Sequence, residues 1–579
     1  MYGVWLIQSA GLPLKLMYTH YDVIIAGGGP AGSTVAALVK KYAPHLRVLV
    51  LEKERFPRHH IGESMLAGTT PVLKESGAFD AVDSYGFVEK LGAAYVWGKE
   101  RKLWGFVFDQ LIEQLQREGK TLPKEYVKAW QVRRGEYDHI LLKHAAEMGA
   151  EVREGARVHR VRTDPMTGRV NGVEFSDDKG AHVAASAIFM DCTGQDALLG
   201  HALKLRDYDA RMNNYALYGY WKDGKWKREY VGTPEHSRIF ITTSARGWIW
   251  YIPVRKDTIS VGFVTHRQTL KAMPAGGPEA LYLDELRANP EMQELLDGAT
   301  LVRLSHDQPR DVMSIQDWSY TSRQMVGPGW AMCGDAAGFV DPILSSGAML
   351  AQELAQKAAY TINSAFMSGS DAQIAAYWNF YQDTYRTYLQ AYKDMASFWY
   401  SNNFSMESWW WQAQRTLNRT HDDAHLSSRE AFFRIASGYA NRAESLSLFG
   451  SYPLHEAVKL VDGLFGAAVD RSVVEADFNG RPLRLHPQAR IGSGMYYWQG
   501  QVRTTRRITA PDGQRYLDLH PGEEVLMRLF DGQHTLEEVN RVAEEIRSVK
   551  ERLPIRSGTE LAIQLDQIGA LAPRAAGVA

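Results

Sequence analysis

The sequence predicts an α/β protein in which a parallel-sheet domain carries an inserted antiparallel sheet. Three observations support this prediction. Residues 21–52 read as a strand, a glycine-rich turn, a helix and a second strand. Residues 215–265 show the alternation of apolar and polar side chains that is typical of antiparallel strands. From about residue 371 the chain changes to aromatic-rich helical patterns.

The glycine-rich turn has the spacing of a dinucleotide site. Gly27 permits a tight turn, Gly29 lets the backbone approach a pyrophosphate, and Gly32 lets the helix pack closely on the strand. The phosphates would then lie at the helix N-terminus, where free N–H groups and the helix dipole favour anions. Glu52 ends the second strand and is positioned to accept from a ribose hydroxyl. A turn without a ligand is the alternative, but both strands, the helix and the acid favour a dinucleotide.

Basic and imidazole side chains follow this unit. Lys53, Arg55 and Arg58 surround the end of the second strand, where they either meet the ligand's phosphates or form solvated surface. His59 and His60 are adjacent, so a regular strand or helix cannot turn both toward one metal ion. We therefore expect no metal site.

Composition limits the classes of function. The 579 residues suffice for two to four domains, and the net charge of -1 gives no field that attracts nucleic acid. Cys192 and Cys333 are the only cysteines, which excludes a disulfide framework and is typical of a reducing cytoplasm. Residues 1–20 lack the features of a signal peptide, and Met17 is an alternative start. No apolar run is long enough to span a membrane.

Between these landmarks the chain alternates strands and helices. Lys90 stands just ahead of an apolar strand pattern, where a lysine is normally a solvated edge residue. An amphipathic helix begins near Arg134, and strands are predicted at 151–158 and 187–194. These elements extend the first domain.

Residues 330–352 return to the first domain. A strand ends at Cys333, and Asp335 then faces the same crevice as the first glycine loop. After Pro342, the residues Ser345 to Gly347 present backbone N–H groups at a helix start, which is a ready anion site.

The sequence also predicts domain boundaries. We expect an extension at 1–20, a first domain at 21–370 with the inserted sheet at about 205–325, an aromatic-rich helical region at 371–495 and a C-terminal module at 496–579. Ile491 to Gly500 has the texture of a boundary. Beyond it, a strand-turn-strand from Ile508 to Leu519 and helices from His534 and Ser557 suggest a winged-helix-like module. Residues 511–579 hold 8 Lys and Arg against 12 Asp and Glu, so this module should not bind DNA.

Three segments resemble the FAD-dependent monooxygenase superfamily, in the family's order. They are GGGPAGS at 27–33, QVRRGEYD with Arg134, and CGDAAGFVDP with Asp335. Two further motifs resemble the signatures of flavin-dependent halogenases: WxWxIP at 248–253, and FxxPxxSxG at 339–347. Lys90 falls where that family carries its catalytic lysine. Ala67 departs from the family, which often has proline there.

The resemblance implies a Rossmann-like FAD-binding domain and a chemistry. FAD would be held by Gly27, Gly29, Ala31, Gly32, Ser33, Glu52, Lys53, Ser64, Arg134, Asp335 and Ala348. Chloride or bromide would bind the N–H groups of Ser346 and Gly347, and hypohalous acid would be relayed to Lys90 to halogenate an electron-rich carbon. The substrate would be kept from the flavin by Trp248, Trp250, Ile252, Pro253 and Pro342.

The resemblance also suggests partners. Only one dinucleotide fingerprint is visible, so we expect reduced flavin to come from a separate flavin reductase. The long C-terminal region resembles the branch that acts on phenols, pyrroles or carrier-tethered acyl groups more than the tryptophan branch, and its members serve secondary metabolism such as antibiotic biosynthesis. The substrate would then be either a free small aromatic compound or one tethered to a carrier protein. The rival readings are a flavin-dependent monooxygenase, a geranylgeranyl-reductase-like oxidoreductase, and a flavin-bound scaffold without catalysis.

Overall fold

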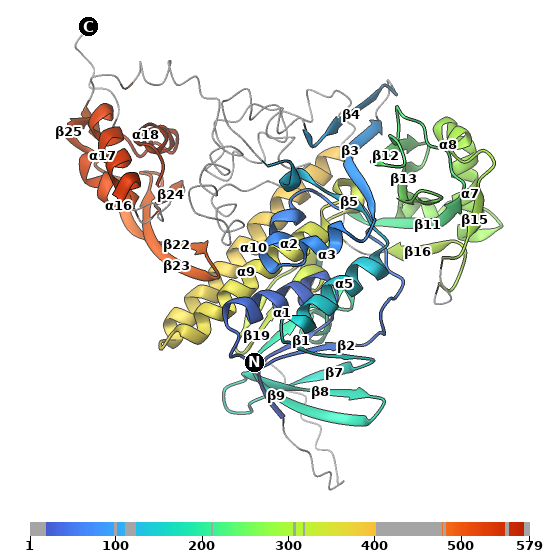
Figure 1. Cartoon of the computed structure of the whole chain (residues 1–579), viewed down its shortest axis with the longest axis horizontal. Helices are drawn as coiled ribbons and strands as arrows, with labels where there is room; N and C mark the ends of the chain where they lie inside the picture. The colour runs from blue at the N-terminus through green and yellow to red at the C-terminus, as the bar shows by residue number, and fades with distance from the viewer. Residues whose placement is uncertain are drawn as a thin grey trace.

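The described chain forms two large sheets, a pair of long helices and a C-terminal module (Figure 1). The computed structural model describes residues 19–97, 101–109, 123–209, 212–304, 308–316, 319–400, 478, 482–513, 515–520, 522–549 and 555–572. The predicted mixed α/β class is confirmed.

The first sheet is mainly parallel and contains the glycine loop. Its strands run in the order β18-β19-β9-β1-β2-β6, and β1 is parallel to both β2 and β9. Both β1 and β2 are largely buried, as expected for strands covered on two faces. The strands are β1 (Thr19–Ala26), β2 (Val48–Glu52), β6 (Glu151–Glu154), β9 (Gly180–Asp191), β18 (Val326–Gly327) and β19 (Trp330–Met332).

Helices and a β-ribbon cover this sheet. Helices α1 (Pro30–Tyr42), α5 (Arg134–Glu147) and α9 (Gly347–Met367) gather on one side of it (Figure 1). The ribbon of β7 (Arg157–Thr163) and β8 (Val170–Asp177) pairs with β9 and lies on the other side. The helix predicted to begin near Arg134 is thereby confirmed.

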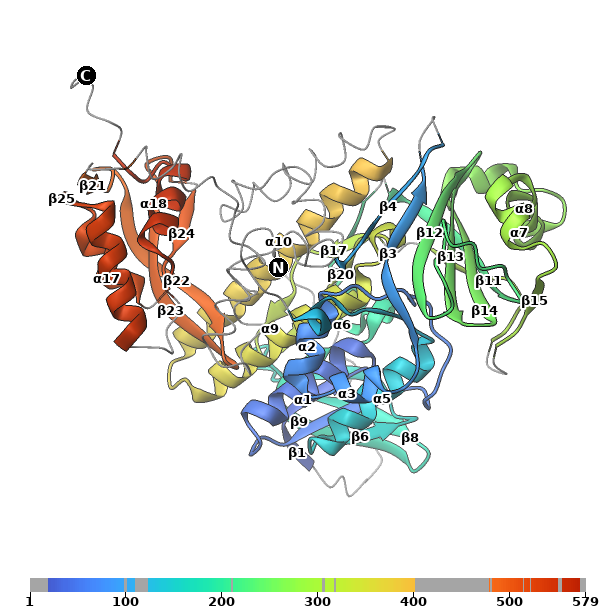
Figure 2. The ribbon, with the colours of Figure 1, turned by 45° about the horizontal axis from the view of Figure 1, so that its top comes forward.

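The second sheet has nine strands and is mainly antiparallel. Its main path is β15-β11-β14-β13-β12-β3-β4, so the antiparallel sheet predicted for residues 215–265 is confirmed. Helices α7 (Gly277–Ala288) and α8 (Pro290–Leu295) pack against it (Figure 2). The strands are β3 (Val88–Val96), β4 (Leu103–Val107), β5 (Trp130–Gln131), β11 (Asn214–Lys222), β12 (His236–Ser244), β13 (Gly247–Arg255), β14 (Thr258–His266), β15 (Thr300–Val302) and β16 (Met313–Gln316).

The aromatic-rich helix α10 (Asp371–Tyr400) packs along α9 and against the first sheet. Its tyrosine hydroxyls bond to backbone at the end of β19. Tyr381 donates to the Met332 carbonyl oxygen at 2.9 Å, and Tyr385 donates to the Gly334 carbonyl oxygen at 2.8 Å. The helix is therefore a structural support for the turn that carries Asp335.

The C-terminal module has its own apolar core. Its elements are β21 (Pro482–Arg484), β22 (Arg490–Trp498), β23 (Gln501–Thr509), β24 (Tyr516–Asp518), α16 (Glu523–Leu526), β25 (Asp531–Thr535), α17 (Leu536–Val549) and α18 (Gly558–Gln567). Residues 491–500, which read as a boundary, form most of β22 and the hairpin turn to β23. The hairpin tip is anchored on α9, where Asn363 Nδ2 donates to the Gly500 carbonyl oxygen and the Val502 N–H to Ser364 Oγ, both at 2.7 Å.

Within the described part of the chain, we find no helix that combines the length and the apolar character needed to cross a bilayer.

Candidate active site

The glycine loop between β1 and α1 requires its glycines. Gly27 has a φ of +101°, and a Cβ atom there would lie 2.2 Å from the Cys192 carbonyl oxygen. A Cβ atom on Gly32 would lie 1.9 Å from the Gly27 carbonyl oxygen, so the helix can approach the strand only with glycine. A Cβ atom on Gly29 would contact only Arg58, at 3.6 Å. The face of Gly29 is thus the open side of the loop.

Buried polar contacts brace this loop. Glu52 accepts from the Gly28 N–H at 2.7 Å and from the Glu54 N–H at 2.8 Å, and Ser33 Oγ donates to the Gly28 carbonyl oxygen at 2.8 Å. Ala31 is buried beside Gly334. The acid named from the sequence therefore holds the loop in shape as well as standing at the end of β2.

The three basic residues after β2 have different surroundings. Lys53 forms an ion pair with Asp196, and Arg55 forms one with Asp178; all four side chains are substantially exposed. Arg58 is different, because it lies against Gly29, its Nη2 is 3.4 Å from the buried Asp138 carboxylate, and its Nη1 is buried without a hydrogen-bond partner among the described residues. The sequence alone could not tell which of the three basic residues lies beside the glycine loop. In the structure it is Arg58.

Arg134 lies at the start of α5 in a buried ion pair. Its Nε and Nη2 donate to the two carboxylate oxygens of Asp138 at 2.8 and 3.0 Å, and its Nη1 donates to the Ile61 carbonyl oxygen at 2.8 Å. Burial opposes ionisation of Asp138, but the charges of Arg134 and Arg58 outweigh it and hold its pKa below the usual value.

Asp335 lies in the short η5 turn (Gly334–Ala336) after β19. Burial raises its pKa to about 6, against the opposing charges of Arg134 and Arg206. Its carbonyl oxygen accepts from the Tyr320 hydroxyl. Because β19 and β1 are both parallel to β9, the turn that follows β19 and the glycine loop that follows β1 lie at the same end of the sheet.

Buried polar atoms without hydrogen-bond partners test whether these residues fit FAD, and they do. Several buried polar side-chain atoms between β2 and α5 have no hydrogen-bond partner in the described structure: Arg58 Nη1, Glu63 Oε2, Ser64 Oγ and both amide atoms of Gln131. Ser64 and Gln131 also pair as a β-bridge. Buried polar groups are nearly always bonded in a complete protein, so this set indicates a polar ligand beside the open glycine loop.

Lys90 is buried on β3, with 2% of its surface exposed. Ser237 pairs with Lys90 and Arg238 pairs with Gly92, so Leu91 is an extra residue in β3. Such a bulge reverses the alternation of side chains. Lys90 Nζ donates to the Met65 carbonyl oxygen at 2.8 Å and lies 5.7 Å from the centre of the Phe108 ring.

The charge of Lys90 is uncompensated. No carboxylate within the described ranges forms an ion pair with it, and burial alone lowers its pKa to about 7. The amine therefore exists in both protonation states near neutral pH. This is the strongest departure from the surface role that strand position alone predicts for a lysine.

The two tryptophans of β13 (Gly247–Arg255) lie side by side. The ring centres of Trp248 and Trp250 are 6.0 Å apart, and both side chains are buried. A Cβ atom on Gly262 would lie 2.1 Å from the Trp250 ring, so the neighbouring strand is shaped around this indole. Ile252 and Pro253 follow on the same strand.

The second motif forms a tight turn before α9. Ser345 has a φ of +55°, Ser346 is the N-cap residue of α9, and Gly347 is its first residue. A Cβ atom on Gly347 would lie 2.5 Å from the Phe339 ring, which explains the glycine. Pro342 begins the one-turn helix η6 (Pro342–Leu344), and Ala348 lies in the first turn of α9. The backbone N–H groups at this helix start are available to an anion.

Sequence reasoning missed Glu63. Its Oε1 accepts from the Tyr220 hydroxyl at 2.8 Å, and burial raises its pKa to about 7 against the lowering influence of the nearby Ser260 and Tyr220 hydroxyls. The signal was weak because a single glutamate after a turn is normally surface. Only the packing of β11 (Asn214–Lys222) on this segment reveals it.

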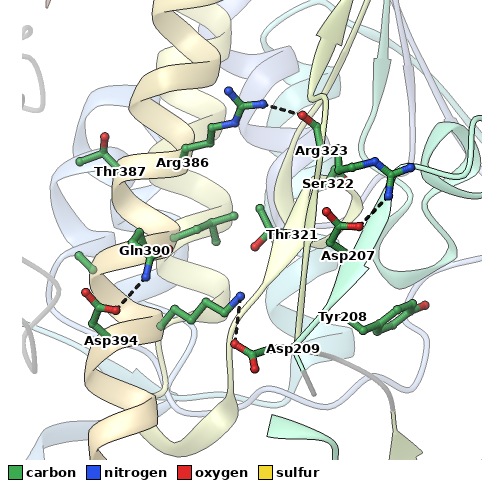
Figure 3. Close-up of a pocket in the computed structure, with 13 residues that line it drawn as sticks. Asp207, Tyr208, Asp209, Thr321, Ser322, Arg323, Arg386, Thr387, Gln390 and Asp394 are labelled. Carbon is green, nitrogen blue, oxygen red and sulfur yellow. Dashed lines mark hydrogen bonds and ion pairs between the residues drawn. The ribbon is translucent and has the colours of Figure 1, made fainter. Parts of the chain in front are cut away.

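Two further features lie outside this constellation. A groove of about 790 Å³ runs between α10, β10 (Arg206–Tyr208) and β17 (Tyr320–Ser322), and no predicted site residue lines it (Figure 3). Its charges pair locally, as in Arg323 with Asp207 at 2.6 Å and Lys393 with Asp209 at 3.2 Å. Across the described ranges, no group of three metal-ligating side chains occurs.

Comparisons with known proteins identify this constellation. A sequence profile described as tryptophan halogenase matches residues 22–121 and 109–446. The chain is 31% identical over 429 residues to tryptophan 2-halogenase of Chondromyces crocatus, covering 73% of this chain and 76% of that protein. It is 33% identical over 341 residues to 1H-pyrrole-2-carbonyl-[peptidyl-carrier protein] chlorinase of Pseudomonas fluorescens, covering 57% and 73%.

Solved structures agree with these matches. The myxobacterial chondrochloren halogenase CndH, described as an FAD-dependent halogenase, superposes with a TM-score of 0.59 at 30% identity, over 77% of this chain and 97% of that chain. The flavin-dependent halogenase CmlS superposes with a TM-score of 0.68 at 24% identity, over 96% of both chains, so its fold extends through the C-terminal module.

Proposed function

The chain belongs to the tryptophan halogenase family and is a flavin-dependent halogenase that uses reduced FAD, oxygen and halide; on that premise we propose that Lys90 carries the halogen to the substrate. The single observation that supports this role is a buried amine to which no described carboxylate is paired. A lysine of that kind is expensive for folding, so a chemical use explains its presence better than a structural one.

Lys90 would receive hypohalous acid in one of two ways. As an ammonium it donates a hydrogen bond that polarises the oxygen–halogen bond. As a neutral amine it forms a nitrogen–halogen bond and releases water. The lowered pKa of about 7 makes both forms accessible, and the absence of a paired carboxylate within the described residues favours the neutral amine.

We propose the remaining roles from position. The N–H groups of Ser346 and Gly347 bind chloride or bromide, because an N-cap residue and the first residue of a helix have no intrahelical acceptor. Trp248 and Trp250, with Ile252, Pro253 and Pro342, keep the organic substrate away from the flavin. Two packed indoles form a rigid wall of the kind that such exclusion needs.

FAD would lie along the glycine loop. When bound in its reduced form, it supplies the oxygen chemistry that converts halide to hypohalous acid. Gly27, Gly29, Ala31, Gly32 and Ser33 shape the pyrophosphate site, with Glu52 at the ribose. Arg58, with an unbonded guanidinium nitrogen in the described structure, is better suited to the phosphates than Lys53. Ser64, Arg134, Asp335 and Ala348 line the rest of the cofactor site.

Glu63 would serve as a proton donor. Its Oε1 is occupied by Tyr220, and its Oε2 is buried without a partner among the described residues. Because its pKa is about 7, a substantial share of Glu63 is protonated at neutral pH and can donate from Oε2.

Substrate and partners follow from the relatives. The pyrrole-2-carbonyl carrier-protein chlorinase supports a carrier-tethered substrate, while an electron-rich free aromatic such as a phenol is the other candidate. A separate flavin reductase would supply reduced FAD. We propose a cytoplasmic location from the two buried, unpaired cysteines.

The domain limits predicted from the sequence remain our proposal: 1–20, 21–370 with the insertion at about 205–325, 371–495 and 496–579. The strands β22 to β24 and helices α16 to α18 support a winged-helix-like C-terminal module. Residues 401–477 lie outside the described residues, so the aromatic-rich helical region predicted there stays a prediction beyond Tyr400.

The test is halide-dependent product formation. The purified enzyme is incubated with a flavin reductase, NADH, oxygen, bromide and an activated phenol, and products are measured by mass spectrometry. Wild type should form a brominated product. Lys90→Ala should lose at least about a thousandfold of this activity, because the halogen carrier is gone.

FAD affinity serves as the control. Lys90→Ala should bind FAD as wild type does, since the amine is not among the proposed cofactor contacts. Bromination at the wild-type rate by Lys90→Ala would remove Lys90 from the mechanism.

A further inference from the structure

Tyr400, the last residue of α10, joins the two signature motifs. Its hydroxyl accepts from Trp248 Nε1 at 2.9 Å and donates to Asp341 Oδ1 at 2.9 Å. Trp248 belongs to the tryptophan strand, and Asp341 opens the loop that leads to Ser346. One hydroxyl from a third element therefore links the wall beside the flavin to the loop at the helix start.

Asp341 is the centre of this linkage. It has 1% of its surface exposed, and its carboxylate also accepts from the Ile343 N–H at 3.0 Å and from Asn214 Nδ2 at 3.1 Å. The carboxylate thus keeps the shape of the loop by capping it, and its negative charge is shared among hydrogen bonds.

We propose that Tyr400 is a positioning residue that sets halide affinity, an inference that rests on the proposed halide site at Ser346 and Gly347. A buried carboxylate five residues before Ser346 repels a halide unless its charge is dispersed. The O–H donated by Tyr400 disperses that charge and fixes the loop. The same hydroxyl holds the Trp248 indole in one orientation.

Tyr400→Phe is the cleanest perturbation. Phenylalanine keeps the ring and removes only the hydroxyl, which leaves Trp248 Nε1 without this acceptor and Asp341 with one donor fewer. We expect bromide to bind about tenfold more weakly, which corresponds to the loss of one such buried hydrogen bond. The Michaelis constant for bromide should rise by the same factor, while kcat at saturating bromide changes by less than about threefold.

Two further variants complete the experiment. Trp248→Phe breaks the same linkage from the other side and should also weaken bromide binding, and the double variant should be no weaker than the worse single variant. Tyr282→Phe is the matched control, because Tyr282 of α7 accepts from Trp221 Nε1 at 2.9 Å and donates to the Val261 carbonyl oxygen at 3.0 Å, in a different buried cluster from Trp248 and Trp250. It should leave bromide affinity unchanged.

Bromide affinity is measured by titrating bromide into the enzyme with oxidised FAD bound and following the absorption spectrum of the flavin. This measurement needs no turnover. Unchanged affinity in Tyr400→Phe, or an equal loss in Tyr282→Phe, overturns the role of Tyr400. A wild type that does not bind bromide overturns both this inference and the proposed halide site. A Lys90→Ala variant that still halogenates overturns the proposed relay and leaves Tyr400 standing. Should Tyr400→Phe fail to fold, Trp248→Phe decides the question.

Discussion

Arg134 and Lys90 are both buried cations, and their surroundings are opposite. The guanidinium of Arg134 meets both oxygens of Asp138 and a backbone carbonyl, so its charge is fully compensated. The amine of Lys90 donates to the Met65 carbonyl oxygen and lies over the Phe108 ring. The pKa of Arg134 is raised, whereas that of Lys90 is lowered to about 7.

The difference separates structure from chemistry. A buried charge with a bidentate partner cannot change its protonation state in the working range, so it can only hold other groups in place. A buried amine without a carboxylate partner in the described part of the chain changes state near neutrality, which suits a group proposed to accept and release an electrophile. Burial is common to both residues, and the counter-ion distinguishes the structural pair at Arg134 from the proposed halogen carrier at Lys90.

Breaking the compensated pair should have the largest effect. Asp138→Asn keeps the size of the side chain but leaves Arg134 and Arg58 without their shared negative charge. We expect a loss of about 3–5 kcal/mol of folding stability, as for other buried ion pairs that lose one partner. The measurement is chemical unfolding of the FAD-free protein.

Glu174→Gln is the matched control, because Glu174 pairs with Arg160 at the surface. It should cost less than about 1 kcal/mol. Equal losses in the two variants would mean that compensation at Arg134 is no more valuable than a surface pair, and the contrast with Lys90 would disappear.

The sequence predicted the fold class and the chemistry-bearing residues where the backbone imposes a residue type. Gly27 and Gly32 are required by contacts below 2.3 Å, and Gly347 by the Phe339 ring, so their spacing can be read without a structure. Lys90 is different. Its burial depends on the packing of β3 beside β12, about 150 residues later, and local pattern cannot contain that information.

Long-range packing explains the other omissions. Arg58 and Lys53 look alike in the sequence, and only the surroundings of Gly29 distinguish them. Glu63 becomes a buried acid through β11, and residues 491–500 form a hairpin because β22 pairs with β23 and rests on α9. Each depends on neighbours far away in the chain.

The pH dependence of halogenation tests whether Lys90, unlike Arg134, changes its protonation state near neutral pH. The neutral amine of Lys90 increases as pH rises through about 7, so the rate should rise on the acidic side, by up to about tenfold per pH unit. Protonated Glu63 decreases through about 7, so the rate should fall on the alkaline side. The predicted profile of kcat/KM is a narrow bell centred near pH 7.

One variant assigns the two sides of the bell to Lys90 and Glu63. Glu63→Gln removes the titrating acid and should be less active than wild type. Its kcat/KM should still rise on the acidic side of the profile but should no longer fall on the alkaline side. Asp138→Asn should keep a bell, because Asp138 is already ionised across this range. A profile that falls as pH rises through 7 in Glu63→Gln would indicate that the ammonium form of Lys90 is the active one.

Folding stability provides the most direct test of an uncompensated charge at Lys90. The pKa of Lys90 is about 7 in the folded protein and 10.5 when unfolded, so between these values the unfolded chain binds more protons. Stability therefore rises with pH from about 7 to 10.5, and the destabilisation caused by the buried ammonium of Lys90 is fully present below pH 7.

Lys90→Met keeps the length of the side chain and removes the amine. Thermal unfolding should show Lys90→Met stabilised relative to wild type at pH 6.5, by a few degrees for a gain of this kind in a large domain, with the gap closing toward pH 10. Because Arg134 stays charged in both states, Arg134→Met should destabilise at both pH values. A Lys90→Met variant less stable than wild type at pH 6.5 would mean that the carbonyl oxygen of Met65 and the Phe108 ring compensate the ammonium, and the distinction between the two buried cations would fail.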